Sequence, residues 1–98
     1  MFILYDVVIT PGLAPVFDDL KVKDPKAYAN VKLKIEEIVN ILELNPDHCK
    51  NLRAPLQQYK RVHVNKSFVL IFKVDKKNKL MIIYDYEHHK KVYKKSYD

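Results

Sequence analysis

The sequence predicts an α+β fold in which an antiparallel sheet of about four strands carries two N-terminal helices on one face. Three observations lead to this class. A run rich in β-branched and aromatic residues opens the chain, two helical patterns follow it, and three apolar segments joined by short polar turns come last. The chain has 98 residues, enough for one hydrophobic core and too few for two. We therefore expect a single domain over residues 1–98.

The first strand is expected at residues 2–10, FILYDVVIT, because β-branched and aromatic side chains favour extended structure. Pro11 and Gly12 end it. A short helix is then predicted over residues 14–20, where apolar side chains recur at the spacing of one helical face: Leu13, Val16, Phe17 and Leu20. Pro15 limits how early this helix can begin.

A longer helix has clear signals at both ends. Asp24 offers an N-cap oxygen, and Pro25 suits the first helical position. Asn45 and Pro46 end the pattern after about five turns. The apolar side of this helix is expected to cover one face of the sheet and consists of Tyr28, Val31, Ile35, Ile38, Val39 and Leu42.

Three strands are predicted in the second half of the chain, at residues 59–64, 68–74 and 80–86. The last two are nearly continuous apolar runs, which is typical of inner strands covered on both faces. Short polar turns separate the three strands and fit antiparallel hairpins. The first strand alternates, with Tyr59, Arg61 and His63 on one side and Lys60, Val62 and Val64 on the other.

The chain is basic, with 18 Lys and Arg residues against 12 Asp and Glu and a formal charge of +6. Such a charge attracts polyanions through phosphate contacts and counterion release. Nucleic acid, the ribosome and an acidic partner protein are the natural candidates. A Lys-rich composition also arises from selection for heat stability, so the charge alone leaves the partner open.

The sequence also predicts a cytoplasmic protein without a metal centre. No segment approaches the run of about 20 apolar residues that a membrane-spanning helix needs. Residues 1–10 lack the basic start and small-residue cleavage site of a signal peptide. Cys49 is the single cysteine, so we expect no internal disulfide, and no Cys/His ligand pattern accompanies it. We expect no cofactor and no membrane partner.

Four segments, taken in order, resemble the RelE/ParE superfamily of toxins from type II toxin–antitoxin systems: KDPKAYANVKLKIEEIVNILELNP, NLRAPLQQYKRVHV, VLIFKV and EHHKKVY. The likeness is greatest to the YafQ-type and RelE-type messenger-RNA endonucleases, and it is strongest from Leu52 to Tyr93. Its most specific parts are the spacing YxxxHV, the strand LIxKV and the ending HxxxY. The resemblance covers nearly the whole chain and implies the RelE-like element order β-α-α-β-β-β.

The resemblance implies metal-free cleavage of messenger RNA in the ribosomal decoding site. A ribose 2′-hydroxyl attacks the adjacent phosphate, and a 5′-hydroxyl leaves. This reaction needs a general base, a general acid and cations near the phosphate. Histidine suits the first two roles, and Lys or Arg suits the third. The implied partners are a cognate antitoxin, which wraps the domain in a toxin–antitoxin hetero-oligomer, and a ribosome carrying messenger RNA.

The catalytic residues that the resemblance implies are His63, His89, Tyr93, Lys50 and Lys60. His63 matches a histidine on the second strand of YafQ-like toxins, and His89 matches one that precedes a terminal aromatic residue, here Tyr93. Lys50 stands where YafQ-like toxins hold another histidine, and Lys60 matches a lysine of RelE-like toxins. The general base is left open among Lys50, Lys60 and His63. Contacts to RNA or phosphate are expected from Arg53, Arg61, Phe68, His88 and Lys91.

Besides Lys50, the chain departs from the family pattern at Arg61, where YafQ-like toxins have an acidic residue, and at three further positions. Ser67 replaces an acidic residue of YafQ-like toxins, and Val69 stands where RelE-like toxins have an arginine. Ala54 replaces the usual glycine of the connector. A site of this composition depends on histidine and lysine more than the site of either type of toxin does.

Other interpretations compete with these assignments. His63 could be a plain surface residue, and Tyr93 could pack the last segment onto the sheet. The adjacent His88 and His89 suggest a metal site, but neighbours on an extended chain point to opposite sides and no third ligand is evident. A function without catalysis is also open, as a ParE-like gyrase inhibitor or as a module that binds RNA or its antitoxin. Such a binder needs charge and shape but no titratable acid and base.

Overall fold

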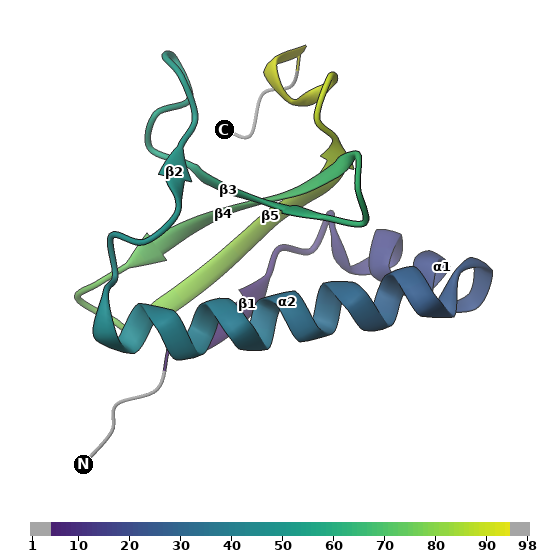
Figure 1. Ribbon diagram of the computed structural model, residues 1–98, viewed down its shortest axis with the longest axis horizontal. Coiled ribbons are helices and arrows are strands. Elements are labelled where there is room, and N and C mark those ends of the chain that lie inside the picture. Colours follow the sequence, from purple (N-terminus) through teal and green to yellow (C-terminus); the bar gives the residue numbers. More distant parts are fainter. Residues whose placement is uncertain (1–4, 95–98) are drawn as a thin grey trace.

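The computed structural model describes residues 5–94, which form a five-stranded sheet with two helices on one face (Figure 1). The predicted α+β fold with two N-terminal helices is confirmed. The start of the expected first strand, residues 2–4, lies outside the described residues. The elements in chain order are β1 (Asp6–Ile9), α1 (Ala14–Lys23), α2 (Pro25–Leu44), β2 (Lys50–Asn51), β3 (Lys60–Val64), β4 (Phe68–Asp75), β5 (Leu80–His88) and the 3-10 helix η1 (Val92–Lys94).

The strands lie in the order β1-β5-β4-β3-β2 across the sheet. β3, β4 and β5 pair antiparallel through short turns, as the sequence predicted. β1 pairs parallel with β5, from Asp6 opposite Leu80 to Ile9 opposite Ile83. The sheet is therefore mixed rather than wholly antiparallel, and β2, a pair of residues in the connector, raises the strand number to five. Parallel neighbours cannot be joined by a tight hairpin, and here all of the chain between β1 and β5 makes the connection.

α2 begins and ends where its local signals predict. The Asp24 carboxylate accepts a hydrogen bond from the Ala27 backbone N–H at 3.1 Å, and Pro25 occupies the first turn. The helix ends at Leu44, shortly before Pro46. Both ends of α2 could therefore be predicted from the residues next to them in the sequence.

α1 runs to Lys23 rather than to residue 20, because no breaking residue intervenes. The Asp24 backbone N–H still donates to the Leu20 carbonyl oxygen at 2.8 Å, which extends the helical pattern up to the start of α2. Phe17 is the buried residue of this helix. Within residues 5–94, no helix is long and apolar enough to cross a membrane.

The main core lies between the helices and the sheet. Figure 1 shows α2 running along this face, below strands β4 and β5. The ring of Phe17 from α1 lies 6.2 Å from that of Tyr86 on β5, measured between centroids. The buried members of this core are Tyr5, Leu13, Phe17, Val31, Ile38, Leu42, Val64, Leu70, Phe72, Met81, Ile83 and Tyr86. This packing leaves the opposite face of the sheet to be covered by other segments.

A second, smaller cluster covers part of that opposite face. The connector between β2 and β3 folds back over it, with the Leu52 backbone N–H donating to the Tyr59 carbonyl oxygen at 2.9 Å. The buried members of this cluster are Leu52, Leu56, Tyr59, Val69, Ile71 and Val92. β4 is therefore buried on both faces, as its apolar run predicted, and residues 69–72 are at most 1% exposed.

Replacing Phe72 by Ala should destabilise the fold strongly. The Phe72 side chain is 0% exposed, so its removal leaves a cavity that the surrounding strands cannot close. We expect the free energy of unfolding to fall by about 3 to 5 kcal/mol, measured by urea denaturation. Val22→Ala is the control, since Val22 is 81% exposed on α1 and its replacement should change stability by less than about 0.5 kcal/mol. Equal denaturation midpoints for the two variants would contradict this account of the core.

Candidate active site

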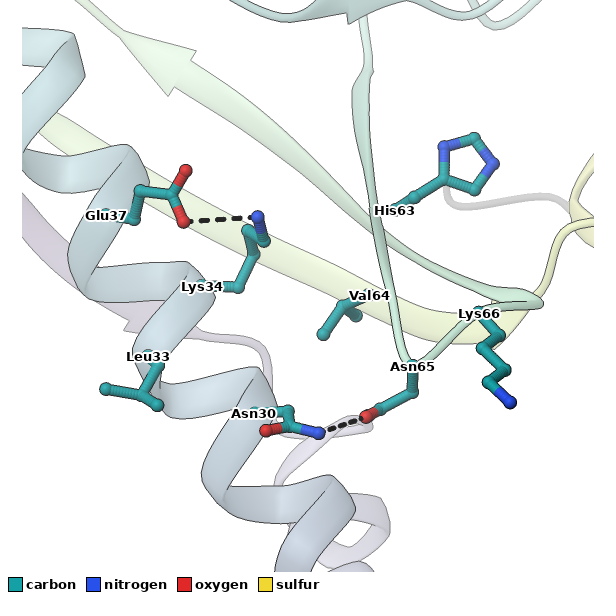
Figure 2. A pocket seen from close by; sticks show the side chains of 8 residues that line it. All are labelled: Asn30, Leu33, Lys34, Glu37, His63, Val64, Asn65 and Lys66. Carbon is teal, nitrogen blue, oxygen red and sulfur yellow. Dashed lines mark hydrogen bonds and ion pairs between the residues drawn. The ribbon is translucent and has the colours of Figure 1, made fainter.

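The candidate active site lies on the face of the sheet that points away from the helices. On β3, Val62 and Val64 pack toward the helix-side core, while Tyr59, just before the strand, belongs to the second cluster. The predicted alternation is thus confirmed, and it directs Arg61 and His63 away from α2. Figure 2 shows the His63 ring on the far side of β3 from the side chains of α2.

His63 and His89 come together at one end of this face. Their ring centroids lie 6.4 Å apart with an angle of 51° between the planes. His89 follows β5 in a turn, and its backbone N–H donates to the Ser67 carbonyl oxygen at 2.9 Å. Both imidazoles are exposed. Two imidazoles from distant parts of the sequence are therefore close enough for one bound molecule to contact both.

His88 and His89 do not point to opposite sides, in contrast to the expectation for an extended pair. Their rings stack at 4.7 Å between centroids, because β5 ends at His88 and the chain turns there. The Nδ1 atom of His88 accepts a hydrogen bond from the Lys90 backbone N–H at 3.2 Å, and the ring meets Phe68 edge-on at 5.8 Å. Among the residues that the structure describes, no group of three or more His, Cys, Asp or Glu side chains is arranged to hold a metal ion.

Tyr93 contacts Arg53 at the edge of this face. The Tyr93 hydroxyl oxygen accepts a hydrogen bond from the Arg53 backbone N–H at 2.9 Å. The guanidinium carbon of Arg53 lies 4.6 Å from the centroid of the Tyr93 ring. The backbone N–H of Arg53 lowers the pKa of the Tyr93 hydroxyl, and the positive charges of Arg53 and Arg61 lower it further. η1 and the connector between β2 and β3 thus meet beside the site.

Lys50 and Arg61 supply positive charge on the face of the sheet that carries His63. The β2–β3 register pairs Lys50 directly with Arg61, so the two side chains stand on the same face of the sheet. Lys50 is exposed and Arg61 is half-buried. Lys91 is exposed in the turn after His89, where its backbone N–H donates to the His88 carbonyl oxygen at 2.9 Å.

Two residues that the resemblance assigned to the site lie on the helix-side face instead. The Lys60 ammonium is within 3.3 Å of the Cys49 carbonyl oxygen and of Asn51 Oδ1, and within 3.5 Å of the Asp47 carbonyl oxygen. Lys60 is only 9% exposed. Phe68 packs against the helix-side core and stacks on Tyr86 at 4.8 Å. Because adjacent strand residues point to opposite faces, neither Lys60 nor Phe68 joins His63 and His89.

Two carboxylates on β5 were missed by the sequence analysis. Glu87 aligns with Val69 and, across β4, with His63, while Asp85 aligns in the same way with Ile71 and Arg61. Glu87 Oε1 accepts from the His88 backbone N–H at 2.8 Å, and Asp85 Oδ1 accepts from the Tyr86 backbone N–H at 2.9 Å. The strand alternation in YDYEHH could have revealed them, but the segment was interpreted as a mostly apolar run.

Comparison with known proteins adds relatives and a structural neighbour. No family model matches the chain. The protein "Putative toxin RelE4" of Methanocaldococcus jannaschii is 45% identical over 92 residues, which are 94% of each chain. An "Uncharacterized protein" of Methanosarcina mazei is 37% identical over 90 residues, covering 92% of this chain and 100% of that one. A chain in the crystal structure of the toxin–antitoxin complex RelBE2 from Mycobacterium tuberculosis matches with a TM-score of 0.63 and 19% identity, over 89% of this chain and 100% of that chain.

The structural match at 19% identity establishes the fold, and the archaeal relative of nearly the same extent identifies the class of protein. The molecule is a small α+β toxin with a cationic, histidine-bearing face. The chain belongs to the RelE family of toxins. The resemblance seen in the sequence is confirmed at this level.

The Tyr93 hydroxyl should ionise at a lower pH than an ordinary tyrosine. The cause is the Arg53 backbone N–H, assisted by two guanidinium charges. Carbon-13 NMR of labelled tyrosine across alkaline pH should show one early-titrating resonance that disappears in Tyr93→Phe. Arg53→Ala should reverse only part of the shift, because it keeps the backbone donor. An unchanged set of titration curves in Tyr93→Phe would contradict the assignment.

The lowered pKa of Tyr93 also makes the stability of the fold depend on pH. The pKa of Tyr93 is lower in the folded protein than in the unfolded chain. Ionised Tyr93 therefore stabilises the fold above the unfolded-state pKa, and this contribution is lost as pH falls through the folded-state pKa. Replacement by Phe should thus cost more stability at high pH than at neutral pH.

Proposed function

We propose that this toxin is an endoribonuclease that cleaves messenger RNA on the ribosome through a metal-free attack by the ribose 2′-hydroxyl. The observation that supports the proposal is the pair His63 and His89, whose rings lie 6.4 Å apart on an open, cationic face. Lys50 and Arg61 stand opposite each other on the same face of the sheet. An acid, a base and phosphate-binding cations are the groups that this reaction needs.

A base, an acid and cations are sufficient for every bond change and proton transfer of this reaction. The base takes the proton of the 2′-hydroxyl, and the 2′-oxygen forms a bond to the adjacent phosphorus. The bond from phosphorus to the 5′-oxygen breaks, and the acid donates a proton to that oxygen. One RNA fragment then ends in a 2′,3′-cyclic phosphate, and the other begins with a 5′-hydroxyl. Negative charge grows on the non-bridging oxygens, where Lys50 and Arg61 would stabilise it.

We assign the base to His63 and the acid to His89. A protonated lysine has no free electron pair, so Lys50 is better suited to holding phosphate than to taking a proton. The Lys60 ammonium faces three oxygen acceptors on the helix side and is directed away from the pair. Neutral His63 and protonated His89 would act together, which predicts a bell-shaped dependence of the cleavage rate on pH.

Arg53 and Tyr93 would bind the RNA beside the scissile bond. The Arg53 guanidinium is exposed and lies over the Tyr93 ring, which leaves its outer edge free to meet a phosphate. Exposed Lys91 and half-buried His88 would extend this contact along the chain leaving β5. These side chains position the substrate, while the two histidines carry the chemistry.

We also propose a cognate antitoxin as the partner that silences the toxin in the cytoplasm. The RelBE2 structure is of a toxin–antitoxin complex, which supports a partner of this kind. The net charge of +6 favours a partner segment rich in Asp and Glu. Such a segment would form a hetero-oligomer and cover the cationic face that the ribosome otherwise meets.

A second candidate function is binding without cleavage, as a ParE-like gyrase inhibitor or as a module for RNA or antitoxin. One observation favours it. Val69 stands where RelE-like toxins have an arginine, and here it is 1% exposed as a member of the second cluster. β4 therefore contributes no guanidinium to the site. A pure binder would need the cations but not the histidines.

Replacing His63 and His89 by Ala separates these two functions. Each single variant should lower the rate of messenger-RNA cleavage on translating ribosomes by about 100-fold to 10,000-fold, which is the usual loss of a general acid or base. The double variant should lose little more than the worse single variant, because the two groups act in one step. Growth arrest should weaken in parallel.

His48→Ala is the matched control. His48 is exposed after α2, outside the histidine pair, and its replacement should leave cleavage unchanged. Unaltered toxicity and cleavage in the His63→Ala, His89→Ala double variant would overturn the nuclease proposal and favour the binder.

A further inference from the structure

The side-chain amide of Asn65 makes hydrogen bonds through both its nitrogen and its oxygen. Its Nδ2 donates to the Ala27 carbonyl oxygen and to the Tyr86 hydroxyl, each at 3.0 Å. Its Oδ1 accepts from Asn30 Nδ2 at 2.9 Å. Both N–H groups and the oxygen are therefore used. One side chain thereby joins α2, the turn between β3 and β4, and strand β5.

The turn that carries Asn65 touches both segments that hold the catalytic histidines. His63 lies on β3, two residues before Asn65. The Ser67 carbonyl oxygen, two residues after Asn65, accepts from the His89 backbone N–H at 2.9 Å. Tyr86, which binds the Asn65 amide, lies on β5 shortly before His89. A shift of this turn would move the two imidazoles relative to each other.

Two consecutive residues of the turn have backbone angles that side chains disfavour, so side-chain hydrogen bonds help to hold the turn in place. Asn65 and Lys66 both have positive φ, at 54° and 63°. Asn tolerates this left-handed region better than most residues, while Lys does not. His63 and His89 are exposed, and the ring that stacks on His89 belongs to His88, its neighbour on the same segment. The position of the turn is then the main local constraint on their separation.

We infer that Asn65 is a positioning residue of the nuclease, which fixes the separation of His63 and His89 by tying the β3–β4 turn to α2 and β5. The inference rests on the proposed function for its catalytic consequence. Misplacement of a catalytic group by about 1 Å costs about 100-fold in rate, so an anchor of this kind matters for chemistry as well as for folding. Asn65 itself acts only through the turn.

The anchor can be weakened without replacing either histidine. The pair Asn30 and Asn65 borders an open pocket of about 380 Å³ between α2 and the turn, which is also lined by Leu33, Lys66 and His63 (Figure 2). Figure 2 shows the bond between the two amides on the α2 side of β3 and the His63 ring on the other side. Asn30→Ala removes one of the three bonds from an exposed helical position where Ala is favoured.

The test compares Asn65→Gly, Asn30→Ala and the control Asn78→Gly. Glycine keeps the left-handed turn accessible while deleting the amide. Asn78 lies in the turn between β4 and β5, at the far end of β4, where its side chain binds Asp75 at 2.9 Å. Each variant is assayed for single-turnover cleavage on programmed ribosomes, for ribosome affinity and for unfolding. The imidazole resonances of His63 and His89 are followed by NMR.

Asn65→Gly should slow cleavage by about 10-fold to 100-fold with little change in ribosome affinity. Asn30→Ala should give an intermediate loss, and Asn78→Gly should cleave at the normal rate. The His63 and His89 resonances should shift in Asn65→Gly but not in Asn78→Gly. Wild-type cleavage in folded Asn65→Gly, or a loss explained by its unfolded fraction, would overturn the inference.

Failure of the proposed function is distinguishable from failure of this inference. If the His63→Ala, His89→Ala double variant still cleaves normally, the nuclease assignment is wrong whatever Asn65 does. The imidazole resonances report positioning without reference to cleavage. Unchanged His63 and His89 resonances in Asn65→Gly would reject the positioning role by themselves, and Asn30→Ala provides the same readout in a variant whose fold is little affected.

Discussion

The burial of β4 on both faces is the constraint on which the rest of the structure depends. Residues 69–72 are at most 1% exposed, and they face alternately toward the helices and away from them. Apolar surface of this extent must be removed from water on both sides. The connector and the C-terminal turn therefore fold over the second face, which brings Arg53 and Tyr93 together and leaves the ends of β3 and β5 open. The candidate active site occupies that open part of the sheet.

Side chains along β3 alternate between the two faces of the sheet, and this alternation determines which cations lie on the same face as the histidines. Arg61 and His63 point away from the helices, whereas Lys60 points toward them. A buried ammonium needs hydrogen-bond acceptors, and the carbonyl oxygens after α2 supply them to Lys60. In the proposed mechanism the imidazoles would therefore carry the chemistry, with lysine and arginine as phosphate contacts. The proposed mechanism would depend on the spacing of these two exposed rings, and the β3–β4 turn contacts both segments that carry them.

Part of the candidate site could be predicted from the sequence. Strand alternation correctly placed Arg61 and His63 on one face and Lys60 on the other. The resemblance nevertheless assigned Lys60 to the site, and the structure places its ammonium among oxygen acceptors on the helix side. The stacking of His88 on His89 could not be predicted, because it depends on where β5 ends. The partners of Asn65 lie 35 to 38 residues away on α2 and 21 residues away on β5, beyond the reach of any local pattern.

The sequence by itself determined the elements and their faces. Asp24 and Pro25 set the start of α2, and apolar runs with short turns set the β3–β4–β5 meander. These signals act between residues that are near neighbours along the chain. Only the tertiary structure decided that β1 lies parallel beside β5 and that His63 and His89 stand 6.4 Å apart. Such pairings join distant segments, so they follow from how the whole core closes over both faces of β4.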